Sequence, residues 1–369
     1  MRFQFQRRFF VCLLTLTLLC CLLFKFSAAE IPIQNTQDPK DIATSAEQTV
    51  KNMTVPDGFK VTVFASEPNV HQPIGFEIDD RGRVWVAECF SYERGTYDDQ
   101  YQDRIIILED TNGDGKMDLR KIFWQGPGPL SSITVGSNGV WALCRGELRY
   151  FEDQNHDDLP DGKPQILLEG WNYKTVRHNI VSGLTWGPDG WLYGRHGITD
   201  SSLVGTPETE PAKRTLIHCG VWRYHPERKI VQEVSSGTTN PWGFDYDEYG
   251  QMFFTNNVNG HLWHMIPGSH YIRMSGHGSD PNPYVYELMT KCADHDHWDS
   301  SSGKWTDSRD TSGIHGKLGG GHSHCGGMIY LGDNWPLKYR NSMFLCNTHG
   351  HRVNNDALER EGSGYVGTH

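Results

Sequence analysis

The chain has 369 residues, among them 40 glycines, 18 prolines and 12% aromatic residues, and this composition favours many short strands over long helices. No amphipathic helical period of any length stands out. A formal net charge of -11 at pH 7 makes the average surface repel phosphate, and no basic stripe offsets it, so nucleic acid is excluded as an expected partner.

The N-terminus has the features of an export signal. Residues 1–8 are basic, residues 9–24 form an uninterrupted run of apolar residues, Cys and Thr, and residues 27–29 are small, as signal peptidase requires. We therefore expect residues 1–29 to be a signal peptide and the mature chain to be periplasmic or at the cell surface. The alternative is an uncleaved N-terminal anchor that associates with the membrane, for which the apolar run is short.

Residues 30–55 are polar and without period, as expected of a flexible linker that precedes a folded domain over residues 56–369. Export would place the chain where disulfides can form. Six cysteines follow the signal: Cys89, Cys144, Cys219, Cys292, Cys325 and Cys346. Their spacing alone does not define a pairing, and the chain has no Cys-x-x-Cys-His motif for covalent haem.

An octet of alternating apolar and polar residues recurs five times. Each octet begins with a small residue, and four of the five end in Gly: GFEIDDRG (75–82), SITVGSNG (132–139), GLTWGPDG (183–190), GFDYDEYG (243–250) and GMIYLGDN (327–334). Another apolar or aromatic strand follows four octets directly and the fifth after a longer turn. Each repeat is therefore expected to form a β-hairpin.

The turn glycines lie at 82, 139, 190 and 250, which gives intervals of 57, 51 and 60 residues. Periods near this length, with about four strands each, are typical of a β-propeller. We predict an all-β chain that folds as a β-propeller with five recognisable repeats. Because a closed ring of this repeat size usually has six blades, we expect the six-bladed type with the last, C-terminal blade incomplete in this chain.

Polar residues gather where each hairpin starts and ends. In an antiparallel hairpin the start of the first strand and the end of the second lie together, so these residues are expected to ring one mouth of a central channel. Those at the starts are His71, Ser131, His178, Asn179, Asn240, His322 and His324; those at the ends are Glu88, Arg145, Arg195, His196, Asn256, Asn257, His349 and Arg352. The alternative for any single His is that it belongs to an ordinary polar rim.

Two loops resemble calcium loops, because oxygen ligands alternate around a sharp turn. The candidate ligands are Asp110, Asn112, Asp114 and Asp118 in the first loop and Asp153, Asn155, Asp157 and Asp161 in the second. Neither loop has Glu at the twelfth position, so neither is a complete EF-hand. The alternative is an Asx-rich turn without an ion. Both loops are expected at the face opposite the His ring, where Ca²⁺ would be structural.

Three His-x-His pairs are candidates for transition-metal binding, since this spacing puts both imidazoles on one side of a strand. They are His295/His297, His322/His324 and His349/His351. No clear carboxylate partner accompanies them in the sequence, so we do not expect a metal there.

Residues 178–197 (HNIVSGLTWGPDGWLYGRHG), 239–257 (TNPWGFDYDEYGQMFFTNN) and 321–369 (GHSHCGGMIYLGDNWPLKYRNSMFLCNTHGHRVNNDALEREGSGYVGTH) resemble the membrane-bound dehydrogenase family of exported bacterial propellers. The likeness covers roughly residues 55–369. That family is similar to soluble glucose dehydrogenases that use pyrroloquinoline quinone (PQQ). The resemblance implies oxidation of a sugar or alcohol by hydride transfer to PQQ, with cytochrome c as a candidate electron acceptor.

The resemblance also implies site residues. In the glucose dehydrogenases a His ahead of a Ser-Gly pair takes the substrate hydroxyl proton, and His178 ahead of Ser182-Gly183 matches that position, as an imidazole suits the task. Thr239 stands where those enzymes have an Arg, so Arg195 and Arg145 are the candidates to replace its charge. The other residues expected to bind cofactor or substrate are His196, Asn240, Asn257, His324, His349 and Arg352.

Two other classes of function fit the same ring. One is a non-catalytic propeller that binds carbohydrate or protein. The other is a lactonase-like hydrolase, which would hold an axial metal with Glu88 and Asn257. A dehydrogenase requires instead a cavity wide enough for a flat, tricyclic quinone. Whether the chain is an enzyme is thus left open between these readings.

Overall fold

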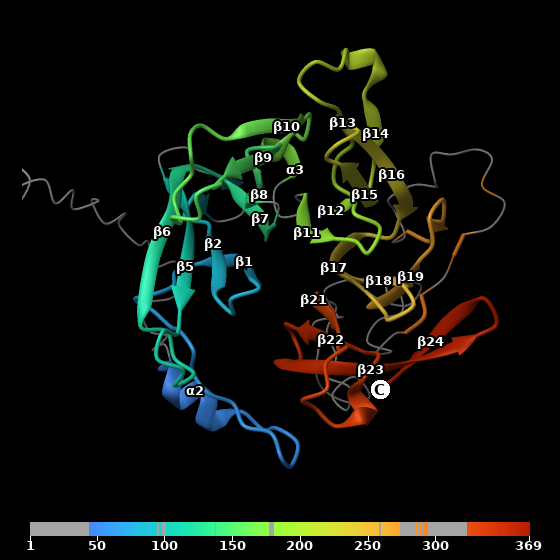
Figure 1. Cartoon of the computed structure of the whole chain (residues 1–369). Coiled ribbons are helices and arrows are strands. Elements are labelled where there is room, and N and C mark those ends of the chain that lie inside the picture. The colour runs from blue at the N-terminus through green and yellow to red at the C-terminus, as the bar shows by residue number, and fades with distance from the viewer. Residues whose placement is uncertain are drawn as a thin grey trace, which may run out of the picture. The chain divides into compact units, whose positions relative to one another are not determined.

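The chain folds into mostly antiparallel β-sheets that follow one another along the sequence, as a propeller requires (Figure 1). The computed structural model describes residues 44–93, 96–97, 101–136, 138–176, 181–257, 260–273, 285, 288–289, 291–293 and 323–369. The predicted signal peptide lies outside these residues. Within the described ranges, no helix is long and apolar enough to cross a membrane.

Five sheets, numbered here as blades 1 to 5, hold most of the described strands. Blade 1 has the order β1 (Pro73–Ile78), β2 (Val84–Glu88), β5 (Gln102–Glu109) and β6 (Leu119–Pro127). Blade 2 has β7 (Leu130–Val135), β8 (Gly139–Cys144), β9 (Glu147–Glu152) and β10 (Gln165–Glu169). Blade 3 has β11 (Ser182–Trp186), β12 (Leu192–His196), β15 (Gly220–His225), β16 (Ile230–Gly237) and β20 (His270–Tyr271). Blade 4 has β17 (Asn240–Tyr246), β18 (Met252–Asn257) and β19 (Leu262–Met265), and blade 5 has β21 (His324–Ile329), β22 (Ser342–Asn347), β23 (Arg352–Glu361) and β24 (Gly364–Thr368).

The remaining elements are short. Two small ribbons pair β3 (Tyr92–Glu93) with β4 (Thr96–Tyr97) and β13 (Ser202–Val204) with β14 (Thr215–Ile217). The helical segments are α2 (Ala46–Asn52), α3 (Tyr173–Val176), η1 (Pro211–Lys213) and η3 (Leu337–Tyr339). Helix α2 lies inside the stretch expected to be a flexible linker. Ser45 caps it by accepting the Gln48 N–H, and Glu47 and Lys51 suit the charges of its two ends.

The hairpins have the predicted arrangement of starts and ends. The first residue of each inner strand pairs with the last residue of the strand that follows it, or in blade 3 with the next-to-last: Pro73 with Glu88, Leu130 with Cys144, Ser182 with Arg195, Asn240 with Asn257, and His324 with Asn347. The prediction that these positions share one end of each hairpin is therefore confirmed for all five described repeats.

Every inner strand carries a β-bulge at the small residue that opens its octet. The register shifts between Pro73 and Gly75, Leu130 and Ser132, Ser182 and Thr185, Pro241 and Phe244, and Cys325 and Met328. At Gly183 the backbone has φ +66°. At Gly243 an added Cβ would lie 2.0 Å from the carbonyl oxygen of Gly326 in the next blade. The recurrent small residue thus permits both the bulge and the close approach of neighbouring blades.

Equivalent octet positions meet across neighbouring blades. The Leu184 N–H donates to Ser132 Oγ at 2.9 Å, the Val135 N–H donates to Glu77 Oε2 at 2.9 Å, and the Ile329 N–H donates to Asp245 Oδ2 at 2.7 Å. Burial raises the pKa of Glu77 and of Asp245, although the hydrogen bonds that each accepts oppose the rise. These contacts join positions at most one residue apart in the octet, so the inner strands of these neighbouring blades meet at equivalent heights.

The apolar cores lie between adjacent blades. Trp85, Phe123 and Phe151 are in the core shared by blades 1 and 2, and Trp141, Trp171 and Trp222 are in the core shared by blades 2 and 3. The next two cores are built around Phe244, Phe254 and Trp263, and around Phe253, Ile329 and Leu345. A single blade cannot bury both of its faces, so each core needs the neighbouring blade.

All six cysteines that follow the predicted signal are free thiols in the structure. Burial raises the pKa of Cys144 and Cys219 to about 12, which leaves both as neutral, unreactive thiols at neutral pH. Cys325 and Cys346 face each other across β21 and β22.

The close approach of blades 4 and 5 predicts unequal effects of two matched substitutions. We expect Gly243→Ala to lower the free energy of unfolding by about 1–3 kcal/mol, because its Cβ meets the Gly326 backbone. Gly75→Ala is the control, since it opens the first octet and has nothing within 4 Å of its added Cβ. Urea denaturation measures both. Equal losses would contradict the proposed blade contact.

Candidate functional site

A cavity of about 600 Å³ lies where the inner strands of the described blades meet. We call it the inner-strand cavity. Its wall combines small residues, hydroxyl groups and aromatic rings; among those from the inner strands are Gly75, Phe76, Ser131, Ser132, Ser182, Gly183, Thr185, Trp242, Gly243, Phe244, Gly326 and Met328, with Arg195 from β12. The volume falls within the range of small-molecule and cofactor sites.

Arg195 is the one charged side chain among the described residues that line this cavity. It is 3% exposed, its Nε donates to the Trp242 carbonyl oxygen at 2.9 Å, and its guanidinium lies 5.4 Å from the centre of the Phe244 ring. Burial lowers its pKa to about 9, while the charge of Asp245 opposes this. The side chain therefore stays cationic at neutral pH.

No carboxylate in the described part of the chain forms an ion pair with Arg195. A buried cation that forms no direct ion pair is costly in a purely structural role, so its position suggests a ligand that brings a negative charge into contact with it. Gly183 leaves room for the Arg195 guanidinium, because an added Cβ at Gly183 would lie 1.9 Å from Arg195 Nη2.

Ser182 supplies a second polar group beside Arg195. The two residues are direct cross-strand partners, and both line the inner-strand cavity. Ser182 is 2% exposed, and its hydroxyl has no hydrogen-bond partner among the described residues. By contrast, Ser131 Oγ donates to the Val181 carbonyl oxygen, and Ser132 Oγ accepts the Leu184 N–H. Arg195 and Ser182 are thus the polar groups in the wall that are placed to meet a ligand.

The other predicted pocket residues either lie outside this wall or fall outside the described residues. His178, the predicted base, and the neighbouring Asn179 fall outside the described residues, as does His322. His196 is fully buried, with its two ring nitrogens within hydrogen-bond distance of the Gly197 carbonyl oxygen and Ser202 Oγ. It holds the segment after β12 and does not reach the inner-strand cavity.

The blade 4 and 5 candidates gather at the same hairpin ends without lining the cavity. Asn240 and Asn257 face each other at the ends of β17 and β18, where the Asn240 N–H donates to Asn256 Oδ1. His324 is fully buried at the start of β21, His349 is half-buried in the turn after β22, and Arg352 is exposed. Of the predicted binding residues, only Arg195 is a described part of the cavity wall.

Glu88 has the wrong surroundings for the metal ligand that a lactonase would need. It is fully buried, accepts the His71 N–H at 2.7 Å through Oε1 and forms an ion pair with Arg120 through Oε2. Burial raises its pKa, although these partners oppose the rise. Both of its oxygens are therefore already bound to protein groups.

The first calcium-like loop turns its oxygens toward its own backbone. Asp110 accepts the Gly113 and Gly115 N–H groups at 2.7 Å, and the bond from Gly115 is the largest of the effects that lower its pKa. Asp118 accepts from Thr111 and from the Asn112 amide. This is the Asx-turn pattern, and calcium binding by the loop stays a prediction.

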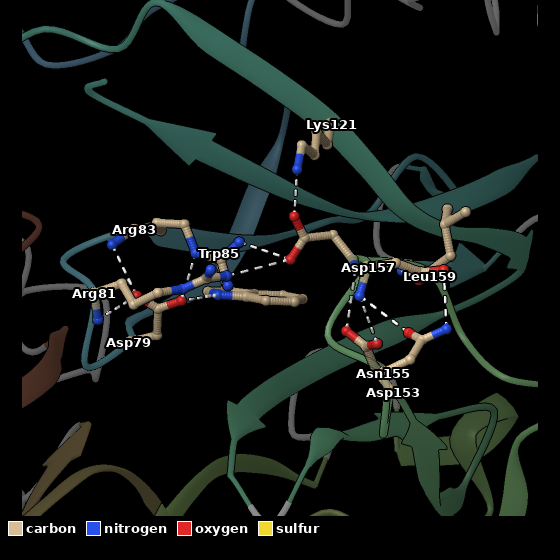
Figure 2. Close-up of polar contacts among 10 residues, drawn as sticks. Asp79, Arg81, Arg83, Trp85, Lys121, Asp153, Asn155, Asp157 and Leu159 are labelled. Carbon is tan, nitrogen blue, oxygen red and sulfur yellow. Dashed lines mark hydrogen bonds and ion pairs between the residues drawn. The ribbon is translucent and has the colours of Figure 1, made fainter. Parts of the chain in front are cut away.

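The second loop follows the same pattern, as Figure 2 shows. Asp153 and Asn155 accept the Asp157 N–H, and Asp157 accepts the Leu159 N–H. Asp158, which the sequence did not single out, binds Arg83 Nη1 at 2.6 Å and Lys121 Nζ. Burial tends to raise its pKa, but these two cations outweigh burial and lower it. Asp158 therefore joins this loop to blade 1 through Arg83 and Lys121.

Residues 45–369 match the model of a family described as Domain of unknown function (DUF7133). The chain belongs to this family. A search of curated protein sequences found no significant match to this DUF7133 chain.

This DUF7133 chain was compared with solved structures. The PQQ domain of pyranose dehydrogenase from Coprinopsis cinerea, in its holo form, matches with a TM-score of 0.52 and 12% identity over 86% of this DUF7133 chain and 82% of that one. The PQQ-bound aldose sugar dehydrogenase from Streptomyces coelicolor matches with a TM-score of 0.46 and 15% identity over 80% and 79%. The first match confirms the prediction of an all-β propeller. The number of blades in the ring stays a prediction.

His196 predicts a pH dependence of stability. Burial lowers its pKa from 6.5 to about 4. As the pH falls below 6.5, the unfolded chain takes up a proton that the folded chain does not, so the free energy of unfolding decreases until the pH reaches about 4. We expect this group to contribute a loss of about 2 kcal/mol between pH 7 and pH 5. Urea denaturation should find a shallower pH slope in His196→Gln, and an unchanged slope would show that His196 is not the group responsible.

Proposed function

We propose that this DUF7133 chain binds PQQ in the inner-strand cavity and oxidises a sugar or alcohol. The observation that carries the proposal is Arg195, a buried cation beside the free Ser182 hydroxyl in a cavity of about 600 Å³. PQQ is a planar polycarboxylate, so it supplies the negative charge that this site lacks. The sequence resemblance to PQQ-dependent dehydrogenases supports the same ligand.

The cavity wall suits a flat, anionic ligand. An added Cβ at Gly75 or Gly326 would meet nothing within 4 Å, so at these two positions the inner strands present only backbone to the open space. Trp242 and Phe244 add aromatic surface beside the Arg195 guanidinium. Arg195 would hold an acidic oxygen of the ligand, and Ser182 would donate a further hydrogen bond.

The chemistry divides between the cofactor and the protein. PQQ, when bound, supplies the quinone that accepts a hydride. His178 takes the proton of the substrate hydroxyl, a role that fits an imidazole near neutral pH. Arg195 holds a fixed positive charge in a buried site, where it stabilises negative charge more strongly than it would in water.

The setting of the reaction is part of the same proposal. The N-terminal segment exports the chain to the periplasm or cell surface or anchors it at the membrane, and cytochrome c accepts the electrons. Calcium in the loops at residues 110–118 and 153–161 is proposed as structural, since both loops lie among the outer strands. A carbohydrate-binding propeller without catalysis is the alternative that the following experiments address.

The role of Arg195 is tested by titrating the purified chain with PQQ and following binding by calorimetry. We expect Arg195→Gln to weaken PQQ binding about 10- to 100-fold. The reason is that the variant loses a hydrogen bond between charged groups, and such a bond contributes about 1.5–3 kcal/mol. Arg145→Gln is the matched control. Arg145 is the other cation proposed to replace the missing Arg, but its guanidinium donates to the Gly128 carbonyl oxygen and lies outside the described cavity wall. Equal affinity in both variants would contradict the assignment of Arg195.

The catalytic proposal is tested by reconstitution with PQQ and Ca²⁺, followed by dye reduction over a panel of sugars and alcohols. We expect turnover in the wild type and a loss of about 10²- to 10⁴-fold in His178→Ala, the usual worth of a general base. Circular dichroism serves as the folding control. If the wild type binds PQQ and turns over no substrate, the chain is a binding protein; equal rates in the variant would remove His178 from the mechanism.

A further inference from the structure

A group of three metal-ligating side chains lies between blades 4 and 5, away from the inner-strand cavity. The ligand atoms of His261, Asp356 and His369 all lie within 4.8 Å of one another. It is the only group of at least three His, Cys, Asp or Glu side chains with this geometry in the part of the chain that the structure describes. None of the three lines the inner-strand cavity.

The three residues come from different elements. His261 immediately precedes β19 in blade 4, Asp356 lies within β23, and His369 follows β24 in blade 5. His261 and Asp356 are both 0% exposed, whereas His369 reaches solvent. The cluster therefore bridges two blades and opens to water on one side.

Asp356 lies at the centre of the cluster. Its Oδ2 is 2.8 Å from His261 Nε2, and its Oδ1 forms an ion pair with His369 Nδ1. Burial alone would raise the pKa of Asp356, but the hydrogen bonds and charges of the two His rings outweigh burial and hold that pKa well below its usual range. The carboxylate is thus ionised at neutral pH, as a metal ligand must be.

We propose that His261, Asp356 and His369 form a binding site for a divalent transition metal of the zinc class, which ties blade 4 to blade 5. Two imidazoles and one carboxylate form a ligand set that zinc uses, with a fourth position left open to water. On binding, the ion takes the place of the protons that the ring nitrogens share with Asp356, and those protons pass to solvent.

The geometry is close to that of a zinc site before the ion binds. Ligand atoms about 2.1 Å from a tetrahedral zinc ion lie roughly 3.4 Å from one another. The three ligand atoms of the cluster lie within 4.8 Å of one another. A shift of the solvent-facing His369 is therefore the main movement that zinc binding would need. The buried ring of His324 packs 5.0 Å from that of His261 and fixes the far side of the cluster. Of the pair His322/His324, the described member His324 thus supports the cluster, and the carboxylate missing from the sequence pattern comes from β23.

The site is tested by zinc titration of the full chain after treatment with a chelator, with calorimetry for affinity and differential scanning fluorimetry for stability. We expect one zinc per chain and a rise in melting temperature on binding. The visible d–d spectrum of the Co²⁺ form should indicate nitrogen and oxygen ligands in a tetrahedral field.

Three variants separate the proposal from a structural His–Asp network. Asp356→Asn and His369→Gln are expected to weaken zinc binding at least tenfold, and His369→Gln should fold normally because its side chain reaches solvent. His264→Gln is the matched control, since this β19 histidine bonds to Gln251 outside the cluster and should leave zinc affinity unchanged. Failure of the wild type to bind zinc, or equal affinity in His369→Gln and His264→Gln, would overturn the proposal.

Discussion

The architecture depends on hydrogen bonds between blades. In each, a backbone N–H of one inner strand donates to a side chain of the inner strand in the preceding blade. A strand at the edge of a sheet leaves N–H groups unpaired, and buried groups of this kind must find acceptors. Ser132, Glu77 and Asp245 supply them to Leu184, Val135 and Ile329. Because these acceptors recur at nearby octet positions, they hold successive blades in one orientation and bring their inner strands together.

That orientation determines where the functional groups meet. Every inner strand begins with a bulge, and the bulge in β11 places Gly183 under the Arg195 side chain. The guanidinium can therefore cross the strand, reach Trp242 and Phe244 of blade 4 and line the inner-strand cavity. Arg195 and Asp245 influence each other's pKa without an ion pair. Asp245, which accepts the Ile329 N–H and so joins blade 4 to blade 5, therefore also helps to keep the Arg195 side chain protonated.

Much of this could be read from the sequence, because it depends on short-range pattern. The octets located all five hairpins, and antiparallel pairing predicted that Arg195 lies beside the start of its own hairpin, where the structure pairs it with Ser182. The directions of side chains after a bulge were not predictable, since the bulge breaks the alternation of faces. His196 directly follows Arg195 in β12, so its side chain lies on the opposite face and turns into the interior instead of toward the inner-strand cavity. The pairing of His261 with Asp356 joins residues 95 positions apart, and no local signal announces such a contact.

A crystal structure of the chain grown with PQQ would show whether the cation in the inner-strand cavity binds an anionic quinone. We expect density for the flat ring system between the inner strands, with an acidic oxygen of the ligand within hydrogen-bond distance of the Arg195 guanidinium. An ordered PQQ bound elsewhere, or a cavity without PQQ at saturating concentration, would show that Arg195 does not bind this cofactor.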